Sequence, residues 1–170
     1  MLFGLFGRGD GRPQNLKVIT RENTHDETAL LRPVIYMGGY RDGTPSAWRS
    51  HVIEKLSDYA ATLIDPSTTV APNPRRDLDG HAEFVLWERS AIDGSDAVIM
   101  WLPRRMDNQA PRVEIGYITA RKKHLIVGAE PELSGLDHLQ CFTQTQFFPC
   151  LDQTIEATIE YIMNGNHKTR

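Results

Sequence analysis

Short apolar segments alternate with longer amphipathic segments along most of the chain. The apolar segments end at glycine, proline or polar residues, which is typical of strands buried on both faces of a parallel sheet. The clearest runs from Asp96 to Pro103 and is ended by the proline. We expect core strands at residues 33–37, 68–71, 96–102, 124–128 and 139–142, and a short extra strand at 16–20.

The segments between these strands carry apolar residues at the three- and four-residue spacing of helices. Thr44 and Pro45 suit the N-cap and first residue of one helix, and Pro111 suits the first turn of another. The helices are expected over 45–63, 81–93, 111–120 and 151–163. Their inward-facing residues are expected to include Trp48, Val52, Leu56, Tyr59, Leu63, Val85, Ile92, Ile155, Ile159 and Ile162.

Alternating strands and helices indicate a parallel sheet with helices on both faces. About five core strands in one domain favour a flavodoxin-like, three-layer α/β/α fold with a mostly parallel five-stranded sheet. We expect an N-terminal arm and connector at 1–32, one α/β domain at 33–163 and a frayed tail at 164–170.

Composition narrows the class of protein. The 170 residues are 40% hydrophobic and 24% charged, with a net charge of -3. This balance gives no reason to expect a nucleic-acid polymer or an anionic membrane as partner. No apolar run approaches the roughly 20 residues that span a bilayer, and the first residues lack the features of a signal peptide. Cys141 and Cys150 have no zinc-site spacing, so we expect a reduced, cytoplasmic protein.

A glycine-rich turn follows the first core strand. Gly38 and Gly39 come directly after Met37, and Gly43 precedes the expected helix. Such a turn can hold a phosphate or sugar hydroxyls on its backbone N–H groups. It matches neither the dinucleotide fingerprint nor the Walker loop.

Three acids fall near this part of the predicted fold. Glu114 lies early in its helix among apolar residues, either as a charge on the helix dipole or as a working carboxylate facing a cleft. Glu88 lies on the stripe of Val85 and Ile92, where it either faces a cleft or pairs at the margin with Arg89 or His81. Asp96 begins its strand, at the edge opposite to the usual ligand edge, which indicates a structural role.

Two carboxylates are the equipment for breaking a glycosidic bond, with one attacking the anomeric carbon and one handling the proton of the leaving group. Tyr36, near the end of the first core strand, either holds the attacking carboxylate or is a core tyrosine whose hydroxyl reaches water.

Four segments, in this order and spacing, resemble the nucleoside 2-deoxyribosyltransferase family and its relatives that hydrolyse nucleoside monophosphates. The resemblance covers about residues 33–128 and rests on Ile35 to Tyr40, Trp87-Glu88, Ser95 to Pro103, and Val113 to Ala120. It implies a flavodoxin-like fold and a homodimer or higher homo-oligomer.

The resemblance also implies roles for single residues. Glu114 matches the nucleophilic glutamate, Tyr36 the tyrosine that orients it, and Glu88 a position where the family has an aspartate. The resemblance places Gly38, Gly39 and Arg41 in the loop that faces the sugar or 5′-phosphate and matches Asp96 to a family aspartate. With Arg104, these are the residues that we expect to bind substrate. At Arg104 the sequence departs from the family, whose transferases can carry an aspartate there.

The resulting hypothesis is an enzyme that cleaves the N-glycosidic bond of a (deoxy)nucleoside through a glycosyl-enzyme ester on Glu114, with no metal or organic cofactor. One alternative is a nucleoside 5′-monophosphate N-glycosidase, with Arg41 and the glycine turn, aided by Arg104 or Arg112, holding the phosphate. The other is a non-catalytic nucleotide-binding or sensing module, because a fold does not determine a function.

Overall fold

A computed structural model describes residues 15–23, 30–40, 46–68, 73–104 and 108–165. Residues 1–14 and 24–29 of the predicted arm and connector, the end of the tail and Arg41 lie outside these ranges. The elements are β1 (Leu16–Ile19), β2 (Val34–Gly39), α1 (Ala47–Leu56), β3 (Ala61–Ile64), a 3-10 turn (Pro66–Thr68), α2 (Leu78–Gly94), β4 (Ala97–Leu102), α3 (Gln109–Ala120), β5 (His124–Ala129), α4 (Leu136–Thr143), β6 (Phe147–Phe148) and α5 (Leu151–Met163).

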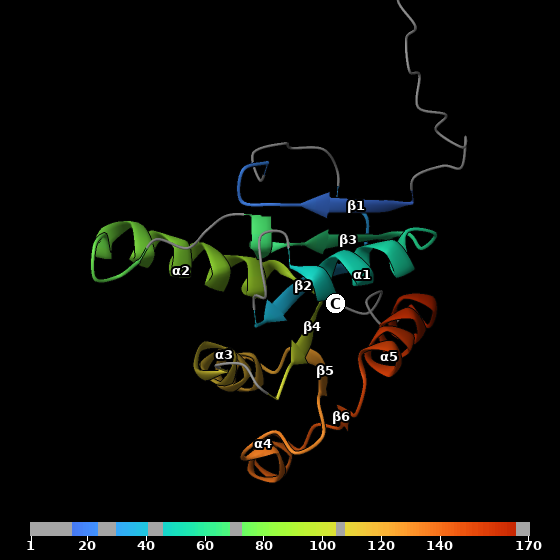
Figure 1. Cartoon of the computed structure of the whole chain (residues 1–170). Helices are drawn as coiled ribbons and strands as arrows, with labels where there is room; N and C mark the ends of the chain where they lie inside the picture. Colours follow the sequence, from blue (N-terminus) through green and yellow to red (C-terminus); the bar gives the residue numbers. More distant parts are fainter. Residues whose placement is uncertain (1–14, 24–29, 41–45, 69–72, 105–107, 166–170) are drawn as a thin grey trace, which may run out of the picture.

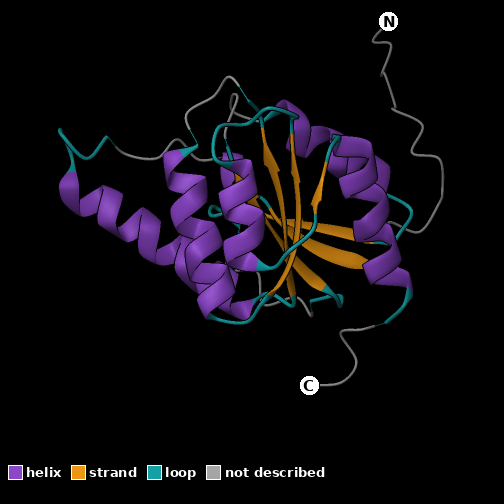
Figure 2. Cartoon of the chain, turned by 90° about the horizontal axis from the view of Figure 1, so that it is seen from below, coloured by secondary structure: helices purple, strands orange, loops and turns teal. Residues whose placement is uncertain are grey.

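The six strands form one sheet in the order β1-β3-β2-β4-β5-β6, and all neighbouring strands are parallel (Figures 1 and 2). Without β1 this is the 2-1-3-4-5 strand order of flavodoxin-like folds. The predicted fold class is therefore confirmed, with six strands instead of five. The predicted extra strand is β1, which pairs with β3 at the edge of the sheet. The strand order reverses between β2 and β4, and ligands bind such sheets at the carboxyl ends of the strands beside that point.

Helices cover both faces of the sheet (Figure 1). Helices α1 and α5 pack on the face to which Ile35 and Met37 of β2 contribute. Helices α2 and α3 pack on the other face, with Val34 and Tyr36. Because side chains alternate along a strand, Gly38 belongs to the same face as Tyr36. The carboxyl end of β2 thus opens toward α2 and α3.

The predicted first helix is too long. Helix α1 ends at Leu56, and Leu63 lies fully buried in β3 between β1 and β2. Apolar residues that continued the helical spacing by coincidence belong to a strand, because strand pairing on both sides of β3 outweighs that pattern. The strand predicted at 68–71 is correspondingly wrong at Thr68, which ends the 3-10 turn, and residues 69–71 lie outside the described ranges.

The strand predicted at 139–142 is also wrong. These residues belong to helix α4, which packs Leu136 and Leu139 against the core and leaves Phe142 75% exposed. A short apolar run does not distinguish a strand from a helix by periodicity. The last strand is the short β6, whose Phe147 is buried.

Three helix starts also differ from the prediction. Helix α2 begins at Leu78, three residues before the predicted start at His81. Helix α1 begins at Ala47 after Ser46, whereas Thr44 and Pro45 lie outside the described residues. Helix α3 begins at Gln109, two residues before Pro111. The strand at β4, the strand at β5 and the closing helix α5 lie where they were expected, and Ile155 and Ile162 of α5 are buried.

Candidate functional site

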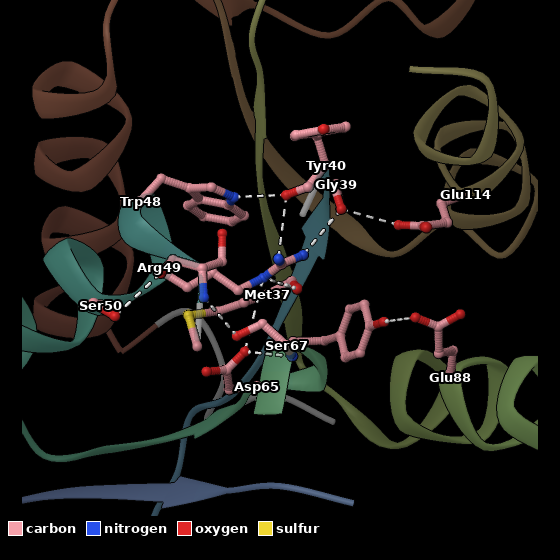
Figure 3. Close-up of polar contacts among 12 residues, drawn as sticks. Met37, Gly39, Tyr40, Trp48, Arg49, Ser50, Asp65, Ser67, Glu88 and Glu114 are labelled. Carbon is pink, nitrogen blue, oxygen red and sulfur yellow. Dashed lines mark hydrogen bonds and ion pairs between the residues drawn. The ribbon is translucent and has the colours of Figure 1, made fainter. Parts of the chain in front are cut away.

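Glu114 reaches from α3 to the carboxyl end of β2. Its Oε2 accepts a hydrogen bond of 3.0 Å from the backbone N–H of Gly39 (Figure 3). Since α3 begins at Gln109, no acid lies in its first turn, and Glu114 is not the dipole charge that was one of its two interpretations. A backbone donor to this carboxyl was not expected from the sequence.

The two glycines at the end of β2 make this approach possible. A Cβ on Gly38 would lie 3.1 Å from the Oε2 atom of Glu114 and 3.2 Å from the Cγ atom of Met100. Gly39 has a φ of +94°, and a Cβ there would lie 3.0 Å from the carbonyl oxygen of Trp101. The first glycine leaves space for the carboxyl group, and the second adopts a backbone conformation that other residues avoid.

Glu88 reaches the same face of β2 from α2. The hydroxyl of Tyr36 donates to its Oε1 at 3.2 Å (Figure 3). Tyr36 is buried in the sheet, so the bond fixes Glu88 against a rigid element. Glu88 is thus one partner of the Tyr36 hydroxyl, and the role of Tyr36 in orienting Glu114, expected from the sequence, stays a prediction.

The stripe of α2 that carries Glu88 is turned slightly from the predicted one. Phe84 and Ile92 are buried, whereas Val85, expected inward, is 38% exposed. Glu88 is four residues from both Phe84 and Ile92, so it lies on the buried stripe, and its side chain is partly buried. Four-residue steps along one helix face place it next to the sheet.

Both acids line one small cleft between α2 and α3. The cleft measures about 130 Å³ and has mostly apolar walls: Val85, Glu88, Arg89, Ile92, Val113, Glu114 and Tyr117. It is smaller than the pockets that enclose whole drug-sized ligands.

Tyr117, one wall of this cleft, is anchored by Asp93. Its hydroxyl donates to Oδ2 of Asp93 at 2.8 Å, and Arg121 donates to Oδ1 at 2.9 Å. The Tyr117 hydrogen bond, with a smaller contribution from Arg121, holds the pKa of the Asp93 carboxyl below its usual value. Ionised Asp93 thereby fixes the outer wall of the cleft.

A second cavity of about 490 Å³ lies beside the start of α3 and is lined by Arg104, Asn108, Gln109, Arg112, Leu133, Ser134 and Gly135. Arg104 pairs with Glu132, and its backbone N–H donates to Glu130. Arg112 donates to the carbonyl oxygen of Ser134. Two guanidinium groups at the carboxyl edge of β4 and β5 make this cavity suitable for an anionic group.

Asp96 is not brought together with these residues. It accepts from the backbone N–H of Val34 at 2.8 Å and pairs with Arg32 at the amino ends of β2 and β4. This is the edge of the sheet opposite to Gly39, and it matches the structural role expected from its place in the chain. We therefore leave Asp96 out of the proposed substrate site.

A buried cation that was not expected from the sequence lies under this site. Arg49 of α1 is 1% exposed and contacts the backbone at the end of β2. Its neighbour Trp48 was expected in the core, but nothing in the helical pattern distinguished Arg49 from a surface arginine.

Among the described residues, no group of three or more histidine, cysteine or acidic side chains is placed to hold a metal ion. Over the same part of the chain, no helix is both long and apolar enough to cross a bilayer.

The sequence was compared with models of known protein families. The family described as nucleoside 2-deoxyribosyltransferase like matches residues 32–133. The chain belongs to this family. A comparison with curated proteins gave no match.

The nucleoside 2-deoxyribosyltransferase-like match covers β2 through β5 and the turn that follows β5. It therefore includes Tyr36, Gly38, Gly39, Glu88 and Glu114, all of which meet at the carboxyl end of β2. The family resemblance stated from the sequence is confirmed.

Proposed function

We propose that this protein cleaves the N-glycosidic bond of a (deoxy)nucleoside by double displacement on Glu114. The observation that supports this most directly is the hydrogen bond from the Gly39 N–H to the Glu114 carboxyl in a cleft shared with Glu88. A backbone N–H donor favours the charged form of a carboxyl group, which is the form that attacks carbon.

In the first step, an oxygen of Glu114 attacks C1′ of the sugar, and the bond from C1′ to the base nitrogen breaks. The electron pair of that bond stays on the base, which Glu88 protonates directly or through water. The product is a glycosyl ester of Glu114. We assign Tyr36 to holding Glu88, since its hydroxyl donates to that carboxyl.

In the second step, a new base or a water molecule attacks C1′, and the ester bond to Glu114 breaks. The attacking group gives its proton to Glu88, which returns both acids to their starting states. Double displacement calls for carboxyl groups about 5–5.5 Å apart, and this separation of Glu88 and Glu114 stays a prediction. The steps involve no metal or organic cofactor.

The test is incubation with a deoxynucleoside and a foreign base, followed by separation of the products. The parent should release the first base, and the quenched protein should carry the added mass of one deoxyribosyl group. Glu114→Ala should lose both signals, whereas Glu54→Ala, an exposed acid on α1, should keep them. Unchanged turnover in Glu114→Ala would exclude the nucleophile.

The second candidate is a nucleoside 5′-monophosphate N-glycosidase. The observation that favours it is the cavity with Arg104 and Arg112, which lies at the same edge of the sheet. Faster base release from the monophosphate than from the nucleoside would support it, and Arg112→Gln should then raise KM for the monophosphate alone. Ligand-dependent thermal stabilisation without base release would instead indicate a nucleotide-binding module.

We also propose that the protein is a homo-oligomer. Two apolar side chains of α2 and α3 are exposed: Val113, which lines the cleft, is 74% exposed, and Leu86 is 59% exposed. Such side chains are covered in oligomers of soluble proteins. Light scattering during size-exclusion chromatography should give a dimer or larger species, and Leu86→Asp should reduce its mass.

A further inference from the structure

Among the residues that the structure describes, Arg49 is the largest side chain that is almost completely buried, and it is charged. It extends from α1 beneath the end of β2, on the sheet face opposite to Glu88 and Glu114 (Figure 3). Charged groups are almost never buried unless they are paired and fully hydrogen-bonded, so its partners indicate what it stabilises.

The partners of Arg49 are backbone carbonyl oxygens at the end of β2. Its Nε donates to Met37 at 3.1 Å, its Nη2 to Gly39 at 3.0 Å and its Nη1 to Tyr40 at 3.2 Å. The planar guanidinium group suits this arrangement, because its donors point along fixed, diverging directions. One side chain thus holds three peptide groups at the carboxyl end of β2.

Buried neighbours hold Arg49 in turn. Asp65, at the end of β3, lies 3.8 Å from its Nε and accepts from the backbone N–H of Ser67 at 2.8 Å. The ring of Trp48 stacks on the guanidinium group at 4.6 Å, and its Nε1 donates to the Tyr40 carbonyl at 2.8 Å. The cation therefore has one preferred orientation.

The peptide group that joins Gly38 to Gly39 lies between two of the peptide groups that Arg49 holds. That peptide carries the N–H that donates to Glu114. Pairing with Met100 and Trp101 of β4 holds one edge of this segment, but neither glycine has a side chain to restrict its backbone, and Gly39 has a positive φ. Contacts from outside the strand must fix the direction of the N–H.

We propose that Arg49 is a positioning residue for Glu114: by clamping the carbonyls on both sides of the Gly38–Gly39 peptide, it aims the Gly39 N–H at the nucleophile. This rests on the proposed function, in which Glu114 attacks C1′. The contact passes through the sheet, from a cation on the α1 face to a carboxyl on the α3 face. Arg49 itself does not touch the substrate cleft, which α2 and α3 line.

The test compares Arg49→Lys with Lys55→Met. The first variant keeps the charge and loses the planar set of diverging N–H donors, and the second removes an exposed cation from the same helix. Each activity is expressed per folded molecule. Arg49→Lys should lower kcat about 10- to 100-fold with little change in KM, because a misdirected carboxyl loses reactivity more than binding. The acid limb of its pH profile should move to higher pH, since the charged form of Glu114 loses a donor. Lys55→Met should match the parent.

A second readout needs no turnover. In the 15N-labelled full chain, the amide signal of Gly39 should move with pH in the parent and cease to do so in Glu114→Gln. In Arg49→Lys this movement should shrink. A kcat and a Gly39 titration equal to those of the parent would overturn the proposal, and so would a lower melting temperature as the sole change.

Two further outcomes are separable. If the parent cleaves no nucleoside but the Gly39 titration depends on Arg49, the proposed function fails and the positioning contact stands. If Arg49→Lys does not fold, Arg49→Gln decides, because it also removes the three-carbonyl contact and leaves no buried cation behind. This variant should lower kcat and should also reduce the pH-dependent movement of the Gly39 amide signal. Parental values for both would overturn the proposal.

Discussion

The carboxyl group of Glu114 lies against the backbone of Gly38, in the space that a side chain would otherwise occupy. A Cβ at Gly38 would come within 3.1 Å of the Oε2 atom. The absence of a side chain in β2 is thus as much a part of the site as the acid that α3 supplies.

Gly38→Ala should therefore impair the site more than the fold. The methyl group meets Glu114 and the flexible Met100, so either side chain must move by a few tenths of an ångström. We expect kcat to fall about 10- to 100-fold. The free energy of unfolding, measured in urea, should fall by about 1–2 kcal/mol. Gly94→Ala is the control, because a Cβ there has no heavy atom within 4 Å; equal kcat losses in both would contradict the assignment.

Tyr36→Phe should act through Glu88. It removes the buried hydroxyl that donates to Glu88 at 3.2 Å and keeps the ring. The loss of one hydrogen bond should lower the free energy of unfolding by about 0.5–1.5 kcal/mol. Base release should slow about tenfold, because Glu88, the proposed proton donor, loses its fixed position.

The control for Tyr36→Phe is Tyr59→Phe. Tyr59 is partly buried and packs against the hydrophobic cluster on the opposite face of the sheet, under α1 and α5. The rate of base release in a single turnover, measured in quenched reactions at a series of pH values, checks the prediction for Tyr36→Phe. A Tyr36→Phe variant with the parental rate at every pH would remove Tyr36 from the mechanism.

Gly128→Ala should destabilise the fold itself. A Cβ at Gly128 of β5 would lie 2.0 Å from Oγ1 of Thr154 in α5 and 2.8 Å from the ring of Trp101. Such overpacking should lower the free energy of unfolding by about 1–3 kcal/mol or more. Adding Thr154→Ala should recover part of the loss, because it removes the atom in closest overlap, and a double-mutant cycle in urea measures this coupling. Strict additivity of the two changes would contradict the overlap.

Asp93 should contribute to the pH dependence of stability. Its pKa is lower in the folded protein than in the unfolded chain, mainly because the Tyr117 hydroxyl donates to it. A lowered carboxyl pKa gives stability that is present above the unfolded pKa of about 3.9 and is lost as the pH falls through the folded value. Asp93→Asn should therefore flatten the fall in stability below about pH 4.

Urea unfolding at a series of pH values from neutral to acid checks this prediction. Asp137→Asn, which removes an exposed carboxyl from α4, is the control for the loss of one negative charge. If both variants kept the parental pH dependence, the hydrogen bond with Tyr117 would not be the cause.

The sequence by itself determined the fold class and the family, and it indicated the two acids of the candidate site. Strand β4 has no polar residue, and α5 repeats its apolar residues at helical spacing, so local pattern was enough to predict both. Glu88 and Glu114 were recognisable as acids among apolar neighbours on amphipathic helices.

Tertiary structure decided where the short elements lie and what each acid contacts. Leu63 continued a helical pattern and yet became a strand residue, because the energy of pairing with β1 and β2 does not appear in local spacing. Gly39 and Glu114 are 75 residues apart, and only the strand order β3-β2-β4 and the packing of α3 bring them together. The burial of Arg49 likewise follows from the position of α1 against the sheet, which no single helix encodes.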